Sequence, residues 1–402
     1  MRFLRLCLVL LIASGIGFGQ ATETVLYSFG GVPNDGTRPV SSLIADGLGN
    51  LYGTASEGGT ADQGTVFELS PQSNATWTET TLYNFCSATN CADGERPLAG
   101  LAMDAAGNLY GTTWTGGPTC PSASGQCGEI FELSPPQQSA QDWTFSVIYG
   151  FCSDLQQGSC LDGYEPAAQL IFDSAGNLYG TTERGGTFGQ GTAFELSSGS
   201  GGWTENVLYS FCSLGALCSD GAYPVASLTF GPSGNLYGTA QHGGRYRAGV
   251  VFQLSKNGGG WQETVLLNTS YGSVAPVSFD AAGNLYGTTP SVVFQLNRKQ
   301  QAEHTRPFSD ASGEDSQAGV LVDRARNLFY GTAAGGGILG GSVWEVNPSR
   351  ELAPLYLFCS LANCTDGQGP MAGLIEDASG NLYGTTEYGG TYGSGVVFKV
   401  TP

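Results

Sequence analysis

Asn50-Leu51-Tyr52-Gly53-Thr54, or NLYGT, is the stretch that decides the fold, because the chain repeats it. A further copy, NLFYGT, begins at Asn327 and contains one inserted residue. Successive copies lie 43 to 69 residues apart, and a period of this size indicates one structural unit built seven times. We number these units 1 to 7 in chain order. The six identical copies begin at Asn50, Asn108, Asn177, Asn235, Asn284 and Asn381.

Each unit contains four short segments with the character of β-strands. In unit 1 these segments are residues 40–46, 50–55, 64–70 and 77–85, and Asp46 opens a tight turn between the first two. No window of the sequence shows a convincing helical period over three turns. Four antiparallel strands in each repeat are typical of a propeller blade, so the sequence predicts an all-β, seven-bladed β-propeller.

The two ends of the repeat region predict how the ring closes. Residues 23–29, ETVLYSF, match the fourth strand of other units, whereas residues 395–400, GVVFKV, match the third strand. We therefore expect the N-terminal strand to complete the last blade within a single propeller of residues 22–402. Such closure removes both free sheet edges, which would otherwise promote aggregation.

Residues that recur from unit to unit have structural explanations. The tyrosine of each copy predicts a wedge between neighbouring blades. The glycine after it, such as Gly53 or Gly111, predicts the close approach of another backbone segment. Four tryptophans open fourth strands and predict packing residues at the rim: Trp77, Trp143, Trp203 and Trp261. The tyrosines are Tyr52, Tyr110, Tyr179, Tyr237, Tyr286 and Tyr383.

Composition and charge exclude several classes of protein. Glycine supplies 63 of the 402 residues, roughly twice the usual 7%, which disfavours helices. Charged residues make up 12%, and the formal net charge is −19. Such an acidic chain repels phosphate backbones and anionic lipids, so we expect no nucleic-acid partner and no basic membrane docking.

The N-terminus has the pattern of a secretory signal peptide over residues 1–21. Arg2 and Arg5 precede an apolar run from Leu6 to Ile16, and small residues follow. The run is too short to cross a bilayer, and a retained anchor is the alternative. Cleavage leaves a formal charge of 13 − 34 = −21. We expect a secreted, extracellular or periplasmic protein without stable membrane insertion.

The cysteines predict five disulfides. Cys7 leaves with the signal peptide, and the other ten of the 11 cysteines form neighbouring pairs in an exported chain. A metal site is the weaker reading, because the spacings are irregular and His242 and His304 are the only histidines. The pairs are Cys86/Cys91, Cys120/Cys127, Cys152/Cys160, Cys212/Cys218 and Cys359/Cys364.

The unit LYGTT…GG…GTVFELS resembles the tandem GloVer (Gloeo/Verruco) repeats of secreted or surface bacterial proteins. The resemblance covers nearly all of residues 22–402. It implies no established enzymatic activity and therefore transfers no catalytic residue. Many members carry a C-terminal sorting anchor, whereas this chain stops at Pro402 on its last strand, which leads us to expect free secretion.

One face of the propeller is the expected functional face. In this strand order, the loops between second and third strands and the connections from each fourth strand to the next first strand share a face. All five cysteine pairs fall in these segments. Loops held by a rigid scaffold are where binding usually occurs, and pre-ordered loops lose less entropy on binding.

Two sets of residues are candidates on this face. The first is a set of DG aspartates, which could ring the central channel and attract a cation. The same pattern is typical of turns whose carboxylate binds local amides, and the absence of a DxDxDG calcium motif favours that role. We predict no cofactor, and a channel cation has no sequence support. These aspartates are Asp35, Asp93, Asp162, Asp220 and Asp366.

The second set surrounds the Gly-Gly pair of the loops between second and third strands. Its residues vary from unit to unit, and Trp, Tyr and Arg suit stacking on a sugar ring or gripping a peptide. An ordinary exposed loop is the alternative. Trp114 is the sharpest candidate, because it lies outside the fourth strands. The candidate ligand-binding residues are Glu57, Trp114, Arg184, His242, Arg245, Tyr246 and Tyr388.

Unit 5 lacks this loop, since Thr289-Pro290 runs almost directly into Ser291-Val292. Units 5 and 6 also lack cysteines and the DGxxP phrase. The sequence therefore predicts a low sector of the ring there, and we hypothesise that it forms a groove through which an extended ligand enters.

Three functions are compatible with these features. The favoured one is a secreted module that binds an extracellular glycan, peptide or protein. An extracellular propeller enzyme of the lyase or hydrolase type is less favoured, because no GxSxG, HExxH or paired-carboxylate motif occurs. A structural component of the cell envelope or matrix is the third alternative. The sequence predicts no catalytic residue, no metal ligand and no oligomeric state.

Overall fold

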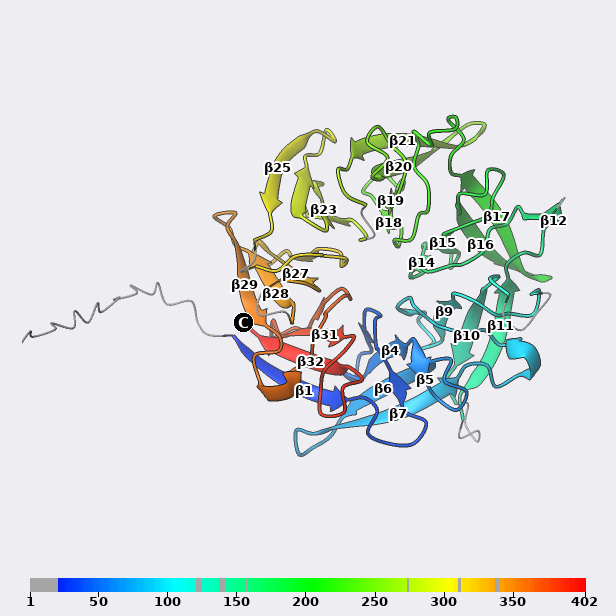
Figure 1. Cartoon of the computed structure of the whole chain (residues 1–402). Helices are drawn as coiled ribbons and strands as arrows, with labels where there is room; N and C mark the ends of the chain where they lie inside the picture. The colour runs from blue at the N-terminus through cyan, green and yellow to red at the C-terminus, as the bar shows by residue number, and fades with distance from the viewer. Residues whose placement is uncertain are drawn as a thin grey trace, which may run out of the picture.

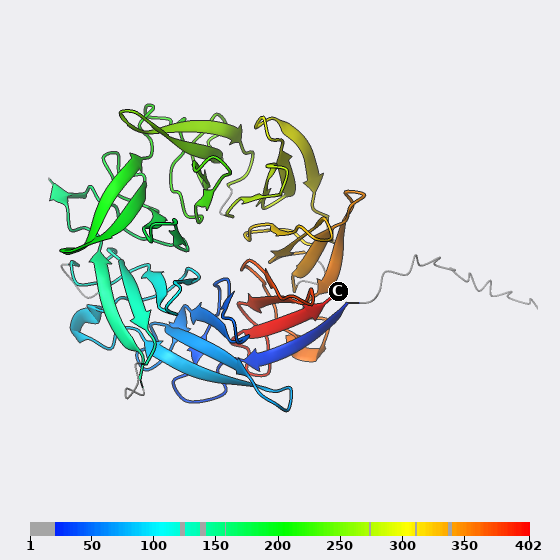
Figure 2. The ribbon, with the colours of Figure 1, turned by 180° about the vertical axis from the view of Figure 1, so that it is seen from behind.

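The seven repeats form seven antiparallel sheets of four strands each. Figures 1 and 2 show the computed structural model, in which these sheets surround a central axis as the blades of a propeller. The structure describes residues 21–120, 125–136, 142–156, 158–272, 275–309, 312–336 and 340–402. The predicted seven-bladed β-propeller is therefore confirmed, whereas residues 1–20 of the predicted signal peptide lie outside the described residues.

The strands of each blade follow the chain from the axis outward. Blade 1 consists of β3 (Ile44–Ala45), β4 (Leu51–Ala55), β6 (Thr65–Pro71) and β7 (Trp77–Asn84). Blade 2 consists of β8 (Ala102–Met103), β9 (Leu109–Thr113), β10 (Glu129–Ser134) and β11 (Thr144–Gly150). Blade 3 consists of β14 (Ile171–Phe172), β15 (Leu178–Thr182), β16 (Thr192–Gly199) and β17 (Gly202–Ser210). Blade 4 consists of β18 (Thr229–Phe230), β19 (Leu236–Ala240), β20 (Val250–Asn257) and β21 (Gly260–Asn268).

The remaining blades keep the same order. Blade 5 consists of β22 (Ser278–Phe279), β23 (Leu285–Thr289), β24 (Val292–Leu296) and β25 (Ala302–Pro307). Blade 6 consists of β26 (Leu321–Asp323), β27 (Leu328–Ala333), β28 (Ser342–Val346) and β29 (Leu352–Leu357). Blade 7 consists of β30 (Ile375–Glu376), β31 (Leu382–Thr386), β32 (Val396–Thr401) and β1 (Thr22–Ser28).

The ring closes through its first and last strands. β1 pairs antiparallel with β32, from Thr22 opposite Thr401 to Ser28 opposite Val396. Figure 1 shows the blue β1 beside the red β32. Val25 packs against the cluster of Phe358 and Phe398. The predicted completion of the last blade by the N-terminal strand is confirmed.

The innermost strands are shorter than the sequence predicted. Residues 40–46 were expected to form one strand, but only Ile44 and Ala45 pair with β4. The side chain of Ser41 takes the place of the backbone hydrogen bonds that a longer strand would make to β4. Its Oγ donates to the carbonyl of Thr54 (3.1 Å) and accepts from the Thr54 amide (3.0 Å). A side chain that satisfies the backbone of the neighbouring strand allows this segment to curve along the channel.

The recurring tyrosines pack between blades, as predicted. Tyr52 of blade 1 lies in one cluster with Leu101, Leu109 and Phe131 of blade 2. Its hydroxyl donates to Asp46 of the preceding turn at 3.3 Å. Trp143, which precedes β11, places its ring 6.2 Å from that of Tyr52. The tryptophans thus pack across blade interfaces.

The glycine after each tyrosine accommodates a side chain, so the predicted approach of a backbone segment was wrong. Gly53 lies opposite Phe67 on the paired strand. A Cβ atom at Gly53 would stand 2.6 Å from Cζ of Phe67, closer than atoms can pack. All seven blades repeat this arrangement, with Phe in six and Trp344 in blade 6. The aromatic ring folds over the glycine because only hydrogen leaves room for it.

In the described part of the chain, no helix has the length and apolar character needed to cross a membrane.

Candidate binding site

Two kinds of loop lie together on one face, which we call the stapled face. It comprises the loops between second and third strands and the connections from each outer strand to the next inner strand. Backbone bridges join the two kinds directly, as between Thr37 and Glu57 or between Glu95 and Thr115. Equivalent bridges join Tyr164 to Arg184, Ala222 to His242 and Gln368 to Tyr388. The predicted shared face is confirmed.

All five predicted disulfides are present on the stapled face. They join neighbouring cysteines across five to eight residues of sequence. Five disulfides are typical of an extracytoplasmic protein. The bonded pairs are Cys86–Cys91, Cys120–Cys127, Cys152–Cys160, Cys212–Cys218 and Cys359–Cys364.

The second cysteine of four disulfides holds the neighbouring Gly-Gly loop through its backbone. The carbonyl of Cys218 accepts from the amide of Gly244 (2.8 Å), and that of Cys364 accepts from the amide of Gly390 (2.9 Å). The carbonyls of Cys91 and Cys160 accept from Gly117 (3.0 Å) and Gly186 (2.9 Å) in the same way. Each such staple therefore ties the connection between blades to the loop that carries the candidate residues.

These cysteines position loops and do not themselves form the concave surface described below. Cys218 and Cys364 line neither hollow at the channel mouth. Both have a left-handed backbone, with φ of 49° and 52°. A disulfide and the bonds of the following turn hold this rare conformation. Their role in the structure is therefore to shape the turn.

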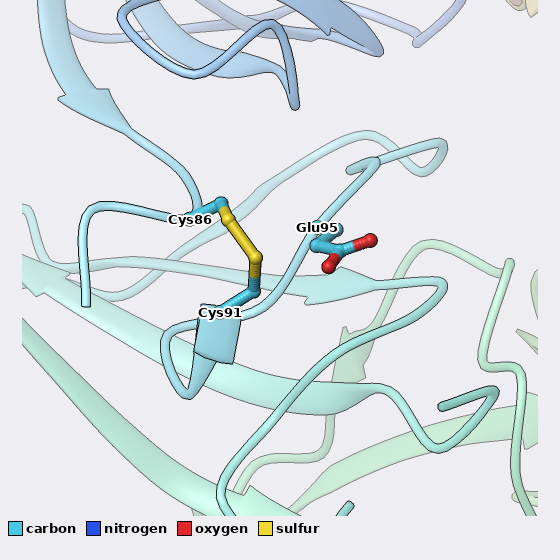
Figure 3. A group of neighbouring side chains, drawn as sticks. All are labelled: Cys86, Cys91 and Glu95. Carbon is cyan, nitrogen blue, oxygen red and sulfur yellow. A yellow bond between two sulfur atoms is a disulfide. The ribbon is translucent and has the colours of Figure 1, made fainter. Parts of the chain in front are cut away.

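One disulfide resembles a metal site by spacing alone. Figure 3 shows Cys86 bonded to Cys91, with the carboxylate of Glu95 nearby. These three residues are the one group in the described part of the chain with the spacing of a metal site. Because each sulfur is bonded to the other, neither is a thiolate, and the group lacks the donors that a metal needs.

The DG aspartates lie beneath the loops of this face. Asp93 is buried and accepts hydrogen bonds from the hydroxyl of Tyr83 (2.8 Å) and the amides of Ser87 (2.8 Å) and Ala88 (3.0 Å). Each of the others accepts from a tyrosine of an outer strand in the same way. This is the geometry of a turn-capping carboxylate. The other pairs are Asp35 with Tyr27, Asp162 with Tyr149, Asp220 with Tyr209 and Asp366 with Tyr356.

Four outer-strand glutamates face these aspartates. Burial raises the pKa of Glu23 and Glu79 to about 7, and that of Glu205 and Glu263 to about 8. The negative charge of a nearby aspartate raises each pKa further. Each glutamate therefore keeps its proton to a higher pH in the folded protein than in the unfolded chain. The neighbouring aspartates are Asp366, Asp35, Asp162 and Asp220, in the same order.

This set of glutamates predicts a protein that loses stability as the pH rises. The unfolded chain releases these protons near pH 4.5, whereas the folded protein holds them until about pH 7 to 8. The stabilisation is complete below pH 4.5 and declines up to pH 8. Each glutamate contributes at most about 1.4 kcal/mol per pH unit, and less because solvent screens it partly. We expect the free energy of unfolding, measured in urea, to fall between pH 5 and pH 8.

Glu205→Gln and Glu263→Gln should flatten that dependence, because an amide does not titrate. The exposed Glu351 provides the matched control, and Glu351→Gln should leave the slope unchanged. A slope that is equal in all three variants and the parent protein would contradict this assignment.

A hollow of the stapled face lies at the mouth of the channel. It has a volume of about 450 Å³ and draws its lining from six blades, so it lies on the axis. A second hollow of about 610 Å³ shares Glu57, Arg96 and Trp114 with it. None of the five DG aspartates lines either hollow. The floor at the axis is a collar formed by Val40, Leu98, Ala167, Val225, Gln317 and Met371.

A charged cluster forms one wall of this hollow. Arg38 donates from Nη1 to Glu57 (2.6 Å) and from Nε to Glu387 (3.0 Å). Its Nη2 also donates to the hydroxyl of Tyr388 at 2.9 Å. Glu387 belongs to the blade 7 loop and Glu57 to the blade 1 loop, so Arg38 ties two blades together. The side chains are held in place before any ligand arrives.

Trp114 and Arg96 of the neighbouring blade 2 form another part of the wall. The guanidinium of Arg96 lies 5.9 Å from the centre of the Trp114 ring, within the range of a cation–π contact. The indole Nε1 is buried and has no hydrogen-bond partner among the described residues. Buried indole N–H groups usually find an acceptor. This wall therefore offers an apolar surface to the hollow, whereas the indole N–H lies buried behind it.

The other candidate residues fall into two places. Arg184 pairs with Glu165 (3.0 Å) and stacks on Tyr223 (4.9 Å), whose ring lies 5.2 Å from that of His242. Arg245 and Tyr246 contact each other at 5.7 Å in the blade 4 loop and line neither hollow at the channel mouth. The structure thus brings Glu57 and Trp114 together at the channel mouth and places Arg184 and His242 in a neighbouring cluster.

Sequence reasoning missed the residue before the proline of each DGxxP phrase. Arg38, Arg96, Glu165 and Tyr223 occupy this position with φ between 56° and 59°, a left-handed conformation that is rare outside glycine. The amide of Arg96 donates to Gln63 of the preceding blade (2.8 Å), and its carbonyl accepts from Trp114 (3.1 Å). Blade-to-blade hydrogen bonds hold the strained turn. The variable fourth residue of DGTRP, DGERP, DGYEP and DGAYP was the available signal.

Large exposed hydrophobic side chains also concentrate on this face. Ten of the eleven in the described residues belong to loops of the stapled face, and Leu48 alone belongs to a turn on the other. Phe188, Tyr246 and Tyr392 occupy equivalent positions in the loops of three blades. This face therefore carries most of the large apolar side chains that solvent reaches in the described residues.

The blade 5 loop is short, as predicted. Only Pro290 and Ser291 join β23 to β24. Blade 5 also contributes nothing to the described lining of the 450 Å³ hollow. Whether this sector guides an extended ligand stays a prediction.

Comparisons with solved structures extend these observations. A gluconolactonase from Xanthomonas campestris is 14% identical, with a TM-score of 0.45 over 84% of this chain and 90% of the other. The extracellular domain of a protein described as a hybrid two-component system of B. thetaiotaomicron is 12% identical, with a TM-score of 0.57 over 96% of this chain. PorZ, a surface component of the type-IX secretion system of Porphyromonas gingivalis, is 14% identical, with a TM-score of 0.53 over 91%. This chain covers 42% and 46% of the last two chains, and at these identities the likeness concerns the fold alone.

Sequence comparison gives the family. No curated protein sequence matches significantly. The model of the Gloeobacter/Verrucomicrobia repeat matches residues 16–161 and 119–292. Since these matches span more than half of the chain and agree with the repeated blades, the protein belongs to the Gloeobacter/Verrucomicrobia repeat family.

Proposed function

We propose that this protein is an exported binding module that holds an extracellular glycan or peptide at the mouth of its channel. The proposal rests on the difference between the two faces of the propeller. The stapled face contains the disulfides, the hollow at the axis and ten of the eleven exposed large hydrophobic side chains in the described residues. Rigid loops around a concave surface are typical of ligand recognition.

The walls of the hollow suit a ligand with an apolar face and polar edges. Trp114 supplies a flat apolar surface for a sugar ring or an aliphatic side chain. Arg38, Glu57 and Glu387 add charged groups to the neighbouring part of the wall. The collar of the channel adds an apolar floor. Such a site recognises hydroxyl or amide groups around an apolar body.

The decisive experiment measures binding of oxidised protein comprising residues 22–402 to an array of bacterial polysaccharides and to a library of unstructured peptides. We expect saturable binding to one of the two classes. Trp114→Ala should weaken it by about 2 kcal/mol, which is roughly thirtyfold, because buried Trp and Arg anchors dominate such sites. Arg96→Ala should also weaken binding.

Leu48→Ala is the matched control, since Leu48 is an exposed apolar residue on the opposite face. It should leave the dissociation constant unchanged. Binding that survives both Trp114→Ala and Arg96→Ala would place the ligand elsewhere. If the protein bound neither polysaccharides nor peptides, the proposal would be refuted.

A further inference from the structure

Outer-strand tryptophans close several blade interfaces on the side away from the stapled face. Each packs on the second-strand tyrosine of the preceding blade, with ring centres 6.2 to 6.5 Å apart in three cases. Trp261 lies against the cluster that contains Tyr179. These large rings fill the space between neighbouring sheets. The three direct pairs are Trp77 with Tyr383, Trp143 with Tyr52 and Trp203 with Tyr110.

Blade 6 has Arg350 where the tryptophan would stand. Trp77 precedes Phe85 by eight residues, and Arg350 precedes Phe358 by the same distance. Arg350 donates from Nη1 to Oε1 of Gln295 in blade 5 at 3.1 Å. Blade 5 has Gln300 at the equivalent position, and Gln300 donates to the hydroxyl of Tyr237 in blade 4 at 3.3 Å. Arg350 therefore stands where the other blades have tryptophan, but its side chain does not fill the space that the tryptophan ring would occupy.

A cavity of about 280 Å³ opens at this interface between blades 5 and 6. Tyr286, Phe294 and Phe329 line it with aromatic rings. Phe329 belongs to the NLFYGT copy, and its ring centre lies 4.4 Å from that of Tyr286. The lining also contains the turns that begin at Asp280 and Asn347, which places the cavity on the face opposite the stapled face.

Two guanidinium groups also line the cavity. Arg306 donates from Nε to the backbone carbonyl of Arg350 at 2.6 Å, so its guanidinium lies beside the Arg350 backbone, and both residues line the cavity. No acid among the described side chains forms an ion pair with either of them. Asp280 lines the cavity, but its carboxylate accepts from the side chain of Asn284 (2.8 Å) and from the hydroxyl of Tyr286 (3.1 Å). Among the described side chains, neither arginine is therefore held in an ion pair, in a protein of net charge −19.

We infer that this cavity binds a small organic acid, in which a carboxylate is carried on a planar ring. The aromatic walls fit the ring, and the planar guanidinium forks of Arg306 and Arg350 match the geometry of a carboxylate. The volume lies near the lower limit of small-molecule sites, which favours a single ring over an oligomer. The site is separate from the hollow at the channel mouth and does not depend on the function proposed for that hollow.

The experiment titrates the oxidised protein with benzoate and follows binding by calorimetry and by the shift of the unfolding temperature. Benzamide tests the need for the charge, and inorganic phosphate at equal ionic strength tests the need for the ring. We expect saturable binding of benzoate and at least tenfold weaker binding of the other two probes. Arg350→Trp should abolish binding, because it restores the wedge and fills the cavity.

Gln300→Trp makes the same change at the interface of blades 4 and 5 and should retain benzoate binding. Arg306→Gln keeps a hydrogen-bonding side chain and should weaken binding at least tenfold, which tests the site even if Arg350→Trp fails to fold. The inference is overturned if benzoate does not bind the parent protein saturably. Equal binding of benzamide, or unchanged binding by both Arg350→Trp and Arg306→Gln, would overturn it as well.

Discussion

Deletion of residues 22–29 is expected to abolish cooperative folding of the propeller. β1 supplies the outer strand of blade 7 and pairs with β32 from Thr22 to Ser28. Phe29, which follows it, is fully buried against Leu43 and Phe67 of blade 1. Loss of such a buried ring alone costs about 3–5 kcal/mol, a large part of the ~5–15 kcal/mol that stabilises a typical domain.

The deletion also exposes an edge of β32 and so favours aggregation. Calorimetry and size-exclusion chromatography should show the loss of the unfolding transition and of the monodisperse peak.

Relocation of the same strand is the matched control. Because Thr22 lies opposite Thr401, an Asn-Gly turn can join Pro402 to residues 21–29 as an ordinary hairpin. A variant that begins at Gly30 and ends with this appended strand should regain a cooperative transition. If the deleted protein unfolds with the same transition as the parent, closure by β1 does not stabilise the ring.

Substitution of a ring-facing glycine is the second change with a large expected effect. A Cβ atom at Gly111 would stand 2.5 Å from Cζ of Phe131 and 2.9 Å from Cδ2 of Leu101. Overpacking of this kind costs about 1–3 kcal/mol. We expect Gly111→Ala to lower the free energy of unfolding by this amount and Phe131→Ala to lower it by about 3–5 kcal/mol. Urea denaturation measures both.

A double variant separates crowding from other effects of the glycine. Phe131→Leu removes the ring atoms that the new Cβ of Gly111→Ala would strike. The variant that combines both changes should therefore lose less free energy of unfolding than the sum of the two single losses. Gly47 is the control, because no atom lies within 4 Å of a Cβ built there, and Gly47→Ala should be nearly neutral. Equal losses for Gly111→Ala and Gly47→Ala would contradict the role of Phe131.

Much of the scaffold could be predicted because its signals are local and repeated. The NLYGT copies specify the number of blades, and the match of residues 23–29 to fourth strands specifies the closure. Neighbouring cysteines can bond only where short loops bring them together, so the five pairs followed from spacing and compartment. The innermost strands were predicted too long, because a side chain such as Ser41 can replace a ladder hydrogen bond without changing the sequence pattern.

The candidate site was predicted only in part. Trp114 and Glu57 were identified because they vary at a repeated loop position, and both line the hollow at the channel mouth. Arg38 and Arg96 were missed because their place depends on a left-handed backbone that the preceding blade holds by hydrogen bonds. The DG aspartates remained ambiguous until their tyrosine and amide partners were known.

The sequence by itself therefore determined the number of blades, the closing strand, the disulfides and the face that carries the varied loops. Each of these follows from periodicity, strand alternation or short spacing along the chain. Only the tertiary structure decided which side chains meet at the axis and which interface stays open between blades 5 and 6. Those contacts join residues of different blades, and their geometry depends on how neighbouring sheets pack rather than on any local pattern.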